Sequence, residues 1–147
     1  MKVACVGGGP SGLFFAILMK LRDPKHRVDV YERHEAGNTF GWGVVFSNQV
    51  IETLVEVNQC LAHRILDQSA EWDEVEVRRD GRVMRSSGHG YIGIGRQRLL
   101  DILAERAKEL GVVIHYGVEV TSLDQFDDVD LIVAADGINS RIRATYA

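Results

Sequence analysis

Three glycines near the start of the chain restrict its fold more than any other feature. They follow the apolar run Val3–Val6 and precede an apolar stretch that extends to Met19. Their spacing fits G-x-G-x-x-G, in which the first glycine makes a tight turn, the second lets the backbone approach a diphosphate, and the third lets a helix pack closely on a strand. A diphosphate held there would face the helix N-terminus, where free N–H groups and the helix dipole favour an anion. The loop is Gly7, Gly8, Gly9, Pro10, Ser11 and Gly12.

An acidic residue stands where such a loop needs one. Glu32 ends the alternating run of residues 27–32, twenty residues after Gly12. A carboxylate at the end of the second strand accepts hydrogen bonds from ribose hydroxyls and repels a 2′-phosphate, so NADP alone is disfavoured while NAD and FAD both remain. The alternative is an ordinary glycine turn with a surface glutamate. The strand, helix and strand within 32 residues predict a right-handed parallel crossover.

Periodicity predicts the remaining elements. We expect a buried helix over 11–21, a functional loop over 34–46, a helix capped by Ser47, a hairpin over 72–86 with an Asp80-Gly81 turn, and an extended segment over 90–95. An amphipathic helix over 96–110 should stop at Gly111, and strands should follow over 112–123 and 129–137. The apolar positions are Val50, Ile51, Leu54, Val55 and Leu61 in the Ser47 helix, Trp72, Val75 and Val77 in the hairpin, and Leu99, Leu103, Ala107 and Leu110 in the later helix. This order predicts an α/β fold with a β insertion, unlike the plain alternation of a dehydrogenase half.

Composition excludes several classes of function. The net charge of −4 argues against a nucleic-acid binder. No apolar stretch is long enough to cross a membrane and no signal peptide is evident, so we expect a cytoplasmic protein without a membrane partner. Cys5 and Cys60 are expected to be buried free thiols in a reducing compartment rather than a disulfide. The five histidines show no metal-ligand spacing, so we expect no metal site.

A second motif lies near the C-terminus. An apolar strand runs into Asp136-Gly137, and Ser140 and Arg143 follow. Asp136 would face the phosphate and ribityl region of a cofactor, Gly137 would allow close backbone approach, Ser140 could cap the next helical turn, and Arg143 could anchor the loop or meet phosphate. A simple Asp-Gly turn after a core strand is the alternative.

Together the motifs resemble those of the flavoprotein aromatic hydroxylases, the single-component FAD monooxygenases. The matching residues are the glycine loop, Glu32-Arg33, Arg96 at a helix start, and Asp136-Gly137 with Ser140 and Arg143. The resemblance implies an FAD/NAD(P)-binding Rossmann-like domain of three layers (ββα), with the start of an antiparallel β substrate domain inserted. It implies an enzyme that hydroxylates a small aromatic substrate with FAD, O2 and either NADH or NADPH, through a flavin C4a-hydroperoxide. That chemistry belongs to the cofactor, so no catalytic side chain is assigned.

The resemblance also implies roles for single residues. Arg96 would contact the FAD phosphates, and Arg98 is the alternative residue for this role. The backbone at Val120 would contact adenine, and a valine that only packs in the core is an equally supported interpretation. The segment of residues 39–47 resembles the branch that hydroxylates aryl-coenzyme A thioesters, and related indole-pathway hydroxylases. Trp42 and Gly43 are therefore candidate substrate contacts, although plain packing is the commoner role of tryptophan. His89 is either a substrate-side residue or a loop histidine.

The resemblance divides the chain as follows. Residues 1–70 and 95–147 would form an incomplete FAD-binding domain, and residues 71–94 the first hairpin of the substrate-side sheet, with the remainder of the enzyme absent after residue 147. The chain would then be an N-terminal fragment that is inactive alone. The alternatives are another FAD-dependent oxidoreductase of this fold, such as a reductase or halogenase, an NAD-dependent dehydrogenase, or a non-catalytic nucleotide-binding module.

Overall fold

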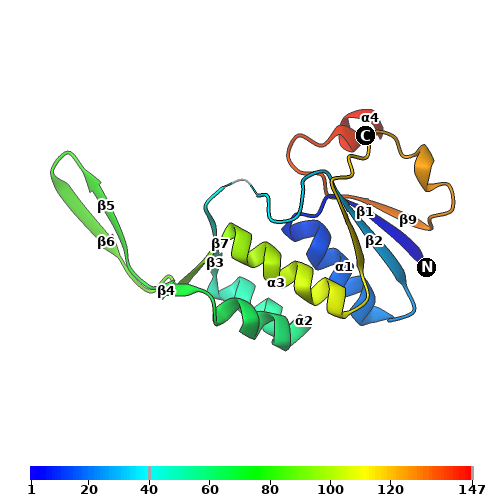
Figure 1. Ribbon diagram of the computed structural model, residues 1–147. Coiled ribbons are helices and arrows are strands. Elements are labelled where there is room, and N and C mark those ends of the chain that lie inside the picture. Colours follow the sequence, from blue (N-terminus) through cyan, green and yellow to red (C-terminus); the bar gives the residue numbers. More distant parts are fainter. Residues whose placement is uncertain (40, 147) are drawn as a thin grey trace. The chain divides into compact units, whose positions relative to one another are not determined.

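The computed structural model describes residues 1–39 and 41–146 of the chain (Figure 1). They form two compact units, one of Met1–Thr39 with Leu100–Ala147 and one of Phe40–Leu99. The first unit contains the parallel sheet and the second contains antiparallel strands. The mixed α/β class with an antiparallel insertion is therefore confirmed.

The first unit is built on a parallel sheet of four strands in the order β8-β2-β1-β9. The strands are β1 (Lys2–Val6), β2 (Arg27–Glu32), β8 (Val113–Tyr116) and β9 (Leu131–Ala134). Cys5 of β1 lies opposite Val30 of β2 and Val133 of β9. The strand expected over 112–123 ends at Tyr116, because Gly117 adopts φ +69° and turns the chain out of the sheet.

Each face of this sheet buries a different set of side chains. Helix α1 (Pro10–Arg22) packs against β1 and β2 and buries Leu13 and Ile17. Ala4 and Val6 point to the opposite face, where they pack with Val120 and with Phe126 of the short 3₁₀ helix η1 (Asp124–Phe126). Strand residues alternate between the two faces, so a continuous apolar run such as residues 3–6 marks a strand buried on both sides.

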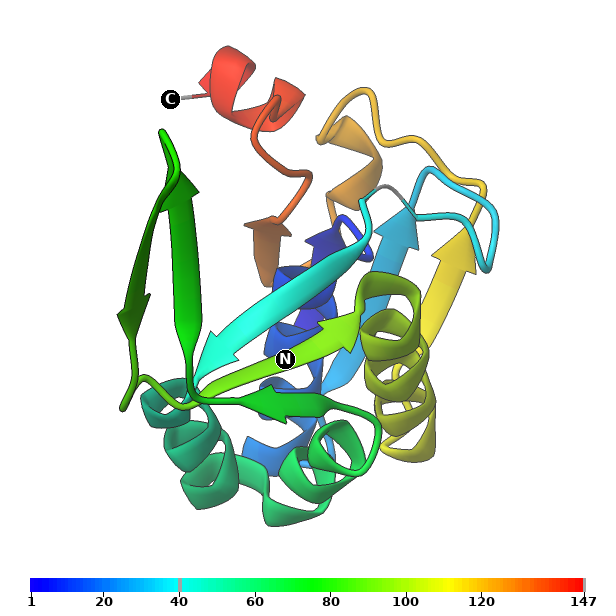
Figure 2. The ribbon, with the colours of Figure 1, turned by 90° about the vertical axis from the view of Figure 1, so that its left-hand side faces the viewer.

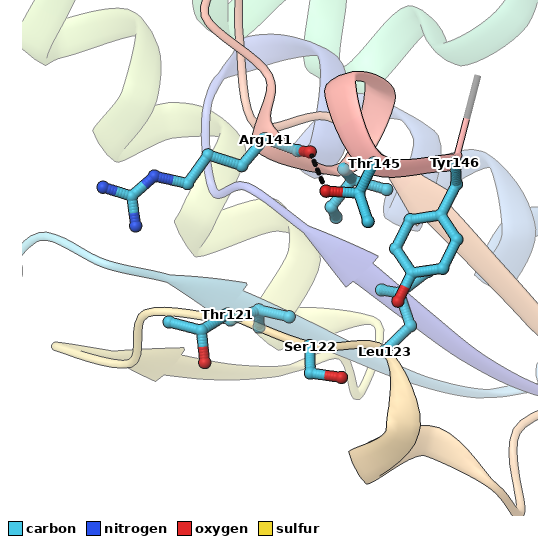
Figure 3. Close-up of a pocket in the computed structure, with 8 residues that line it drawn as sticks. Thr121, Ser122, Leu123, Arg141, Thr145 and Tyr146 are labelled. Carbon is cyan, nitrogen blue, oxygen red and sulfur yellow. Dashed lines mark hydrogen bonds between the residues drawn. The ribbon is translucent and has the colours of Figure 1, made fainter.

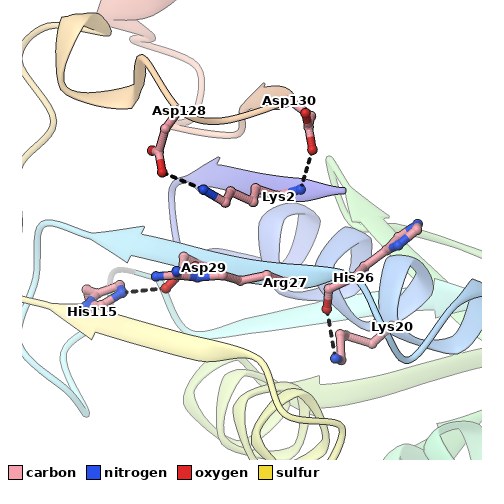
Figure 4. Close-up of polar contacts among 8 residues, drawn as sticks. All are labelled: Lys2, Lys20, His26, Arg27, Asp29, His115, Asp128 and Asp130. Carbon is pink, nitrogen blue, oxygen red and sulfur yellow. Dashed lines mark hydrogen bonds and ion pairs between the residues drawn. The ribbon is translucent and has the colours of Figure 1, made fainter.

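Polar side chains connect β1 and β2 to neighbouring segments of the first unit (Figure 4). Buried Asp29 accepts a hydrogen bond from the Arg27 Nε at 3.1 Å, and its other oxygen lies 2.9 Å from His115 Nε2 of β8. Lys2 reaches Asp128 through its Nζ at 2.7 Å and Asp130 through its backbone N–H at 2.6 Å. The buried carboxylate is thus fully partnered, as a polar group inside a sheet must be.

Helix α3 (Arg96–Glu109) confirms the expected amphipathic pattern. Leu99, Leu103 and Ala107 are buried, and Leu110 just after the helix is half-buried. Gly111 follows with φ +83°, the left-handed conformation that ends helices. The short helix α4 (Arg141–Tyr146) comes last in the described chain.

The second unit contains an antiparallel sheet with the order β3-β7-β4. Its strands are β3 (Gly43–Ser47), β7 (Tyr91–Gly95) and β4 (Ala70–Trp72). The loop expected over 34–46 is therefore wrong from Gly43 onward, because Val44 and Phe46 pair in register with Ile94 and Ile92. The pairing partner lies almost fifty residues along the chain, so local sequence did not reveal it.

Helix α2 (Asn48–Leu66) contacts this sheet and follows Ser47 as expected, but the Ser47 side chain makes no capping hydrogen bond. The helix is kinked at Asn58, whose Oδ1 accepts from Leu61 N at 3.1 Å and so caps the second half. The apolar face expected for this helix is confirmed for only part of its residues. Of its five positions Ile51 and Leu61 are buried, Leu54 is half-buried, and Val50 and Val55 are exposed.

A separate two-stranded hairpin completes the second unit (Figure 2). Strands β5 (Val75–Arg79) and β6 (Arg82–Ser86) are joined by Asp80 and Gly81, with φ of +49° and +74°. Two positive φ values are typical of the type I′ hairpin turn, which confirms the expected Asp-Gly turn. Trp72 does not belong to the hairpin, because it pairs with Tyr91 in the other sheet.

None of the helices in the described chain combines the length and the apolar composition that a membrane span requires.

Candidate functional site

The glycine loop joins β1 to α1 in the first unit, and its first and third glycines are required by close backbone contacts. A Cβ on Gly7, which has φ +113°, would lie 2.2 Å from the carbonyl oxygen of Ala135. A Cβ on Gly12 would lie 2.0 Å from the carbonyl oxygen of Gly7. Neither clash can be relieved by a side-chain movement. These two glycines therefore let the helix and the end of β9 close tightly around the loop.

Gly9 differs from the other two. A Cβ at this position would meet no atom within 4 Å. Gly9 is also the N-cap of α1, where no side chain bonds to the first-turn N–H groups and Pro10 opens the helix. The first N–H groups of a helix lack intrahelical partners. The open side of the loop thus offers uncapped donors and the positive end of the helix dipole to an anion.

Glu32 is brought directly against the loop. Its Oε2 accepts a hydrogen bond from Gly8 N at 2.7 Å, and its Oε1 accepts from His34 N at 2.9 Å. A Cβ on Gly8 would lie 2.8 Å from the Glu32 Cβ, so this middle position also needs glycine. The carboxylate keeps free lone pairs for ribose hydroxyls, since it has about four acceptor sites. Arg33, the next residue, is exposed, and its Nε donates to His34 Nε2 at 3.2 Å.

The second motif forms a compact turn at the end of β9. The Asp136 Oδ2 accepts from Arg141 N at 2.9 Å and from Ile142 N at 3.4 Å, and Gly137 has φ +92°. Burial alone would raise the pKa of Asp136, but hydrogen bonds from the Ser140 hydroxyl and from backbone N–H groups outweigh it and lower this pKa. The Asp136 carboxylate is therefore held in its charged form.

Ser140 and Arg143 stabilise this turn from the helix side. The Ser140 Oγ accepts from Arg143 N at 3.0 Å, which confirms Ser140 as a helix cap. The Arg143 guanidinium donates to the carbonyl oxygen of Ile138 at 2.5 Å. Of the two roles expected for Arg143, the structure shows the loop anchor.

Val120 lies where the core meets a pocket. Its side chain is buried in the apolar cluster with Ala4 and Val6. The same residue lines a pocket between residues 120–123 and α4, with Arg141, Thr145 and Tyr146 on the helix side (Figure 3). The core role of Val120 is thus present, and the contact of its backbone with adenine stays a prediction.

Arg96 begins α3 in the second unit. Its N–H donates to the carbonyl oxygen of Trp42 at 3.1 Å, and a Cβ on Gly41 would lie 3.5 Å from its Cδ. The Arg96 Nε is buried and has no partner among the described residues. Its rival Arg98 donates through Nε to Gln68 at 3.2 Å. The unsatisfied donor therefore favours Arg96 over Arg98 as the residue available to an anion.

The two candidate substrate contacts of the same unit behave differently. The Trp42 side chain is fully exposed (100%), so it has no packing role within the described residues. A Cβ on Gly43 would lie 3.1 Å from the carbonyl oxygen of Ile94, a tight contact that favours a small residue where β3 pairs with β7. His89 stacks on Tyr91 at 5.4 Å and contacts Ser86 Oγ at 2.6 Å, which is a structural role in the loop.

Sequence reasoning missed one feature of the first unit, the packing of Gly8 under Glu32. The sequence contains one signal of this contact. Gly8 is a glycine at the first x of G-x-G-x-x-G, where the motif allows any residue. Nothing local indicated that the acid would bind the loop itself as well as a ligand.

Two buried polar atoms fit the cofactor that the motifs imply. Asp136 Oδ1 and Arg96 Nε are both buried without a partner among the described residues. A ribityl or ribose hydroxyl would satisfy the first and a phosphate oxygen the second. Gly9 leaves space for a diphosphate at the N-terminus of α1. The residues present in the first unit thus fit a dinucleotide such as FAD, and the second unit offers one donor that fits a phosphate.

Comparison with known proteins shows the family of the chain. The profile of the family described as "FAD binding domain" matches residues 1–147. The chain is 42% identical to a salicyloyl-CoA 5-hydroxylase from Streptomyces sp over all of its length and 28% of the relative. It is 30% identical to a 3-hydroxy-4-methyl-anthranilyl-(aryl-carrier protein) 5-monooxygenase from Streptosporangium sibiricum over 97% of its length and 40% of the relative. The chain thus spans well under half of these two proteins.

The fold is also that of solved structures. The crystal structure of 2-methyl-3-hydroxypyridine-5-carboxylic acid oxygenase, mutant C294A, superposes with a TM-score of 0.84, 24% identity, and coverage of 99% of this chain and 42% of that one. This likeness supports the arrangement of elements described above.

Proposed function

The chain belongs to the family of FAD-binding domains, and on this premise we propose that it is the FAD-binding part of a longer flavoprotein monooxygenase. The whole enzyme would hydroxylate a small aromatic substrate with O2 and NADH or NADPH. The observation that carries the proposal is the glycine loop, where Gly9 is open to a ligand while Gly7, Gly8 and Gly12 are packed against backbone or Glu32. Of the two relatives described above, the first is named a hydroxylase and the second a monooxygenase.

Several residues of the first unit would hold the cofactor. The loop of Gly7–Gly12 would bind the diphosphate through backbone N–H groups, and Glu32 would accept from the ribose hydroxyls. Asp136 Oδ1 would accept from a hydroxyl of the ribityl chain, with Gly137 allowing close approach. Arg33 and the Val120 backbone are proposed contacts of the adenosine end.

In the second unit Arg96 would meet a phosphate, and Trp42 with Gly43 would contact the aromatic substrate. The buried, unpartnered Arg96 Nε and the fully exposed Trp42 indole support these assignments. When bound, FAD supplies the oxygen-transfer chemistry, and the protein positions it and excludes water.

The substrate class is the finer part of the proposal. We assign an aryl thioester of coenzyme A, because the relative of 42% identity is named for salicyloyl-CoA. The second relative is named for an aryl group on a carrier protein, which is also an acyl-type linkage.

The test is to purify the full-length protein and record its absorbance spectrum. We expect a flavin spectrum that persists through gel filtration, and oxidation of NADH or NADPH that an aromatic substrate accelerates. A colourless protein that does not bind added FAD would overturn the proposal. A protein that binds FAD but shows no substrate-stimulated oxidation would instead be another oxidoreductase of this fold.

A further inference from the structure

The β5–β6 hairpin has two unlike faces. Register places Val75, Val77, Arg79, Arg82, Met84 and Ser86 on one face, because cross-strand partners share a face. We call this set the arginine-tipped face. Glu76, Arg78, Val83 and Arg85 lie on the other, which we call the ion-paired face.

The ion-paired face neutralises its own charge. Arg85 Nε lies 2.8 Å from Glu76 and 3.3 Å from Glu74, and Arg78 pairs with the same Glu76 carboxylate. These hydrogen bonds lower the pKa of Glu76, the one from Arg78 contributing most. The two arginines of this face are therefore occupied within the hairpin.

The arginine-tipped face is not neutralised in this way. Arg79 and Arg82 stand directly opposite each other beside the turn, and like charges in that position repel. Arg82 makes no ion pair with any residue the structure describes, and the one acidic partner of Arg79 is the adjacent, exposed Asp80 at 3.4 Å. Glu76, the other acid of the hairpin, lies on the ion-paired face. Two exposed guanidinium groups with a single exposed acidic partner between them can bind a multivalent anion.

Apolar side chains continue from the arginine pair along the same face. Val77 and Met84 form the next cross-strand pair and are 49% and 59% exposed. At the base of the hairpin, Asp73 accepts from Gly88 N at 2.8 Å and from Gly90 N at 3.1 Å, which holds the adjoining loop. Along the arginine-tipped face, the apolar pair Val77 and Met84 is followed by the positively charged pair Arg79 and Arg82 next to the turn. This positive charge is local, because the net charge of the chain is −4.

We propose that the arginine-tipped face binds the 3′-phospho-ADP portion of a coenzyme A thioester. Arg79 and Arg82 would bind the phosphates, and Val77 with Met84 would pack against the adenine or the pantetheine chain. The argument is charge complementarity, since coenzyme A carries a diphosphate and a 3′-phosphate and Arg binds phosphate through two parallel hydrogen bonds. The inference rests on the proposed thioester substrate and names the residues that recognise its carrier.

The test measures binding of free coenzyme A, dephospho-coenzyme A and pantetheine to the full-length, FAD-loaded protein by titration calorimetry. The variant R79Q/R82Q is compared with R78Q/R85Q, which removes the same charge from the ion-paired face. We expect R79Q/R82Q to weaken binding of coenzyme A roughly tenfold, as for the loss of two exposed charge contacts, and to leave pantetheine binding unchanged. R78Q/R85Q should change coenzyme A binding less than twofold, and R79K/R82K should restore most of it.

Three results would overturn the proposal. Equal weakening by the two double variants would indicate general electrostatics, and no weakening by either would show that the hairpin does not bind the nucleotide. Tight binding of an acidic carrier protein that R79Q/R82Q abolishes, with coenzyme A binding unaffected, would assign the face to a protein partner. Every variant is also checked for a normal flavin spectrum and for NADH or NADPH oxidation that the substrate stimulates. If both are retained, the proposed function holds and any of these three results counts against coenzyme A binding at the hairpin alone.

Discussion

Glu32 and Gly8 are joined by a hydrogen bond of 2.7 Å from the glycine N–H to the carboxylate Oε2. The acid expected to bind a ribose therefore also contacts the loop that is proposed to hold the diphosphate. The other carboxylate oxygen accepts from His34 N at 2.9 Å, so the Glu32 side chain is fixed between the loop and the residues after β2. We therefore propose that the shape of the loop and the recognition of a ribose are coupled.

This coupling predicts the effect of substituting Glu32. In E32Q one oxygen becomes an NH2 group, so either Gly8 N or His34 N loses its acceptor. Hydrogen bonds to charged groups contribute about 1.5–3 kcal/mol, so FAD affinity should fall by roughly tenfold or more. Flavin fluorescence titration of the apoprotein measures this affinity. E32D, which keeps the charge on a shorter side chain, is the control, and unchanged FAD affinity in E32Q would show that the carboxylate is not used.

The loop glycines predict two separable defects. G12A would push a Cβ to 2.0 Å from the Gly7 carbonyl oxygen, so it should lower the free energy of unfolding by about 1–3 kcal/mol. G9A meets no atom within 4 Å and should change that free energy by less than about 1 kcal/mol. G9A should nevertheless weaken FAD binding, since its methyl group occupies the side open to the diphosphate.

Urea denaturation and FAD titration, both performed on each variant, separate the two effects. A G9A protein with wild-type FAD affinity would place the diphosphate elsewhere. A G12A protein as stable as wild type would contradict the packing seen between the loop and α1.

Sequence reasoning predicted the first unit better than the second for a physical reason. The strand, loop and helix of residues 2–22 are determined by short-range patterns, namely an apolar run, fixed glycine positions and an apolar helix. Strand β3 pairs with β7, which lies far along the chain, and Trp72 pairs with Tyr91 of β7 instead of joining the hairpin. Both placements depend on long-range partners that local sequence does not indicate. The kink at Asn58 likewise depends on a side-chain bond to Leu61 that helical periodicity does not reveal.

The lowered pKa of Asp136 predicts a dependence of stability on pH. A carboxyl group with a lower pKa in the folded state stabilises the fold above its unfolded pKa, ordinarily 3.8, and loses that contribution as the pH falls through the folded value. D136A should cost about 1 kcal/mol at pH 7, because Arg141 N and Ile142 N lose their acceptor. Urea denaturation from pH 7 down to pH 3 measures the difference between wild type and variant.

That difference should shrink as the pH falls below about 4, where the wild-type carboxyl begins to be protonated in the unfolded state. D136N, which keeps an acceptor oxygen but no charge, should be intermediate at pH 7. A difference between wild type and D136A that stays constant over the whole pH range would contradict the role of the charged form.

The two cysteines should differ sharply in reactivity. Cys5 lies at the centre of the parallel sheet with no exposed surface, and burial raises the pKa of its thiol to about 12. Cys60 is exposed on α2, so the expectation that both thiols are buried is wrong for Cys60. Because the thiolate is the reactive form, iodoacetamide at pH 8 should alkylate Cys60 and leave Cys5 unmodified in the native protein, as peptide mapping by mass spectrometry would show. In urea both should react at similar rates, and alkylation of Cys5 in the native C60S variant would show that the sheet opens locally around β1.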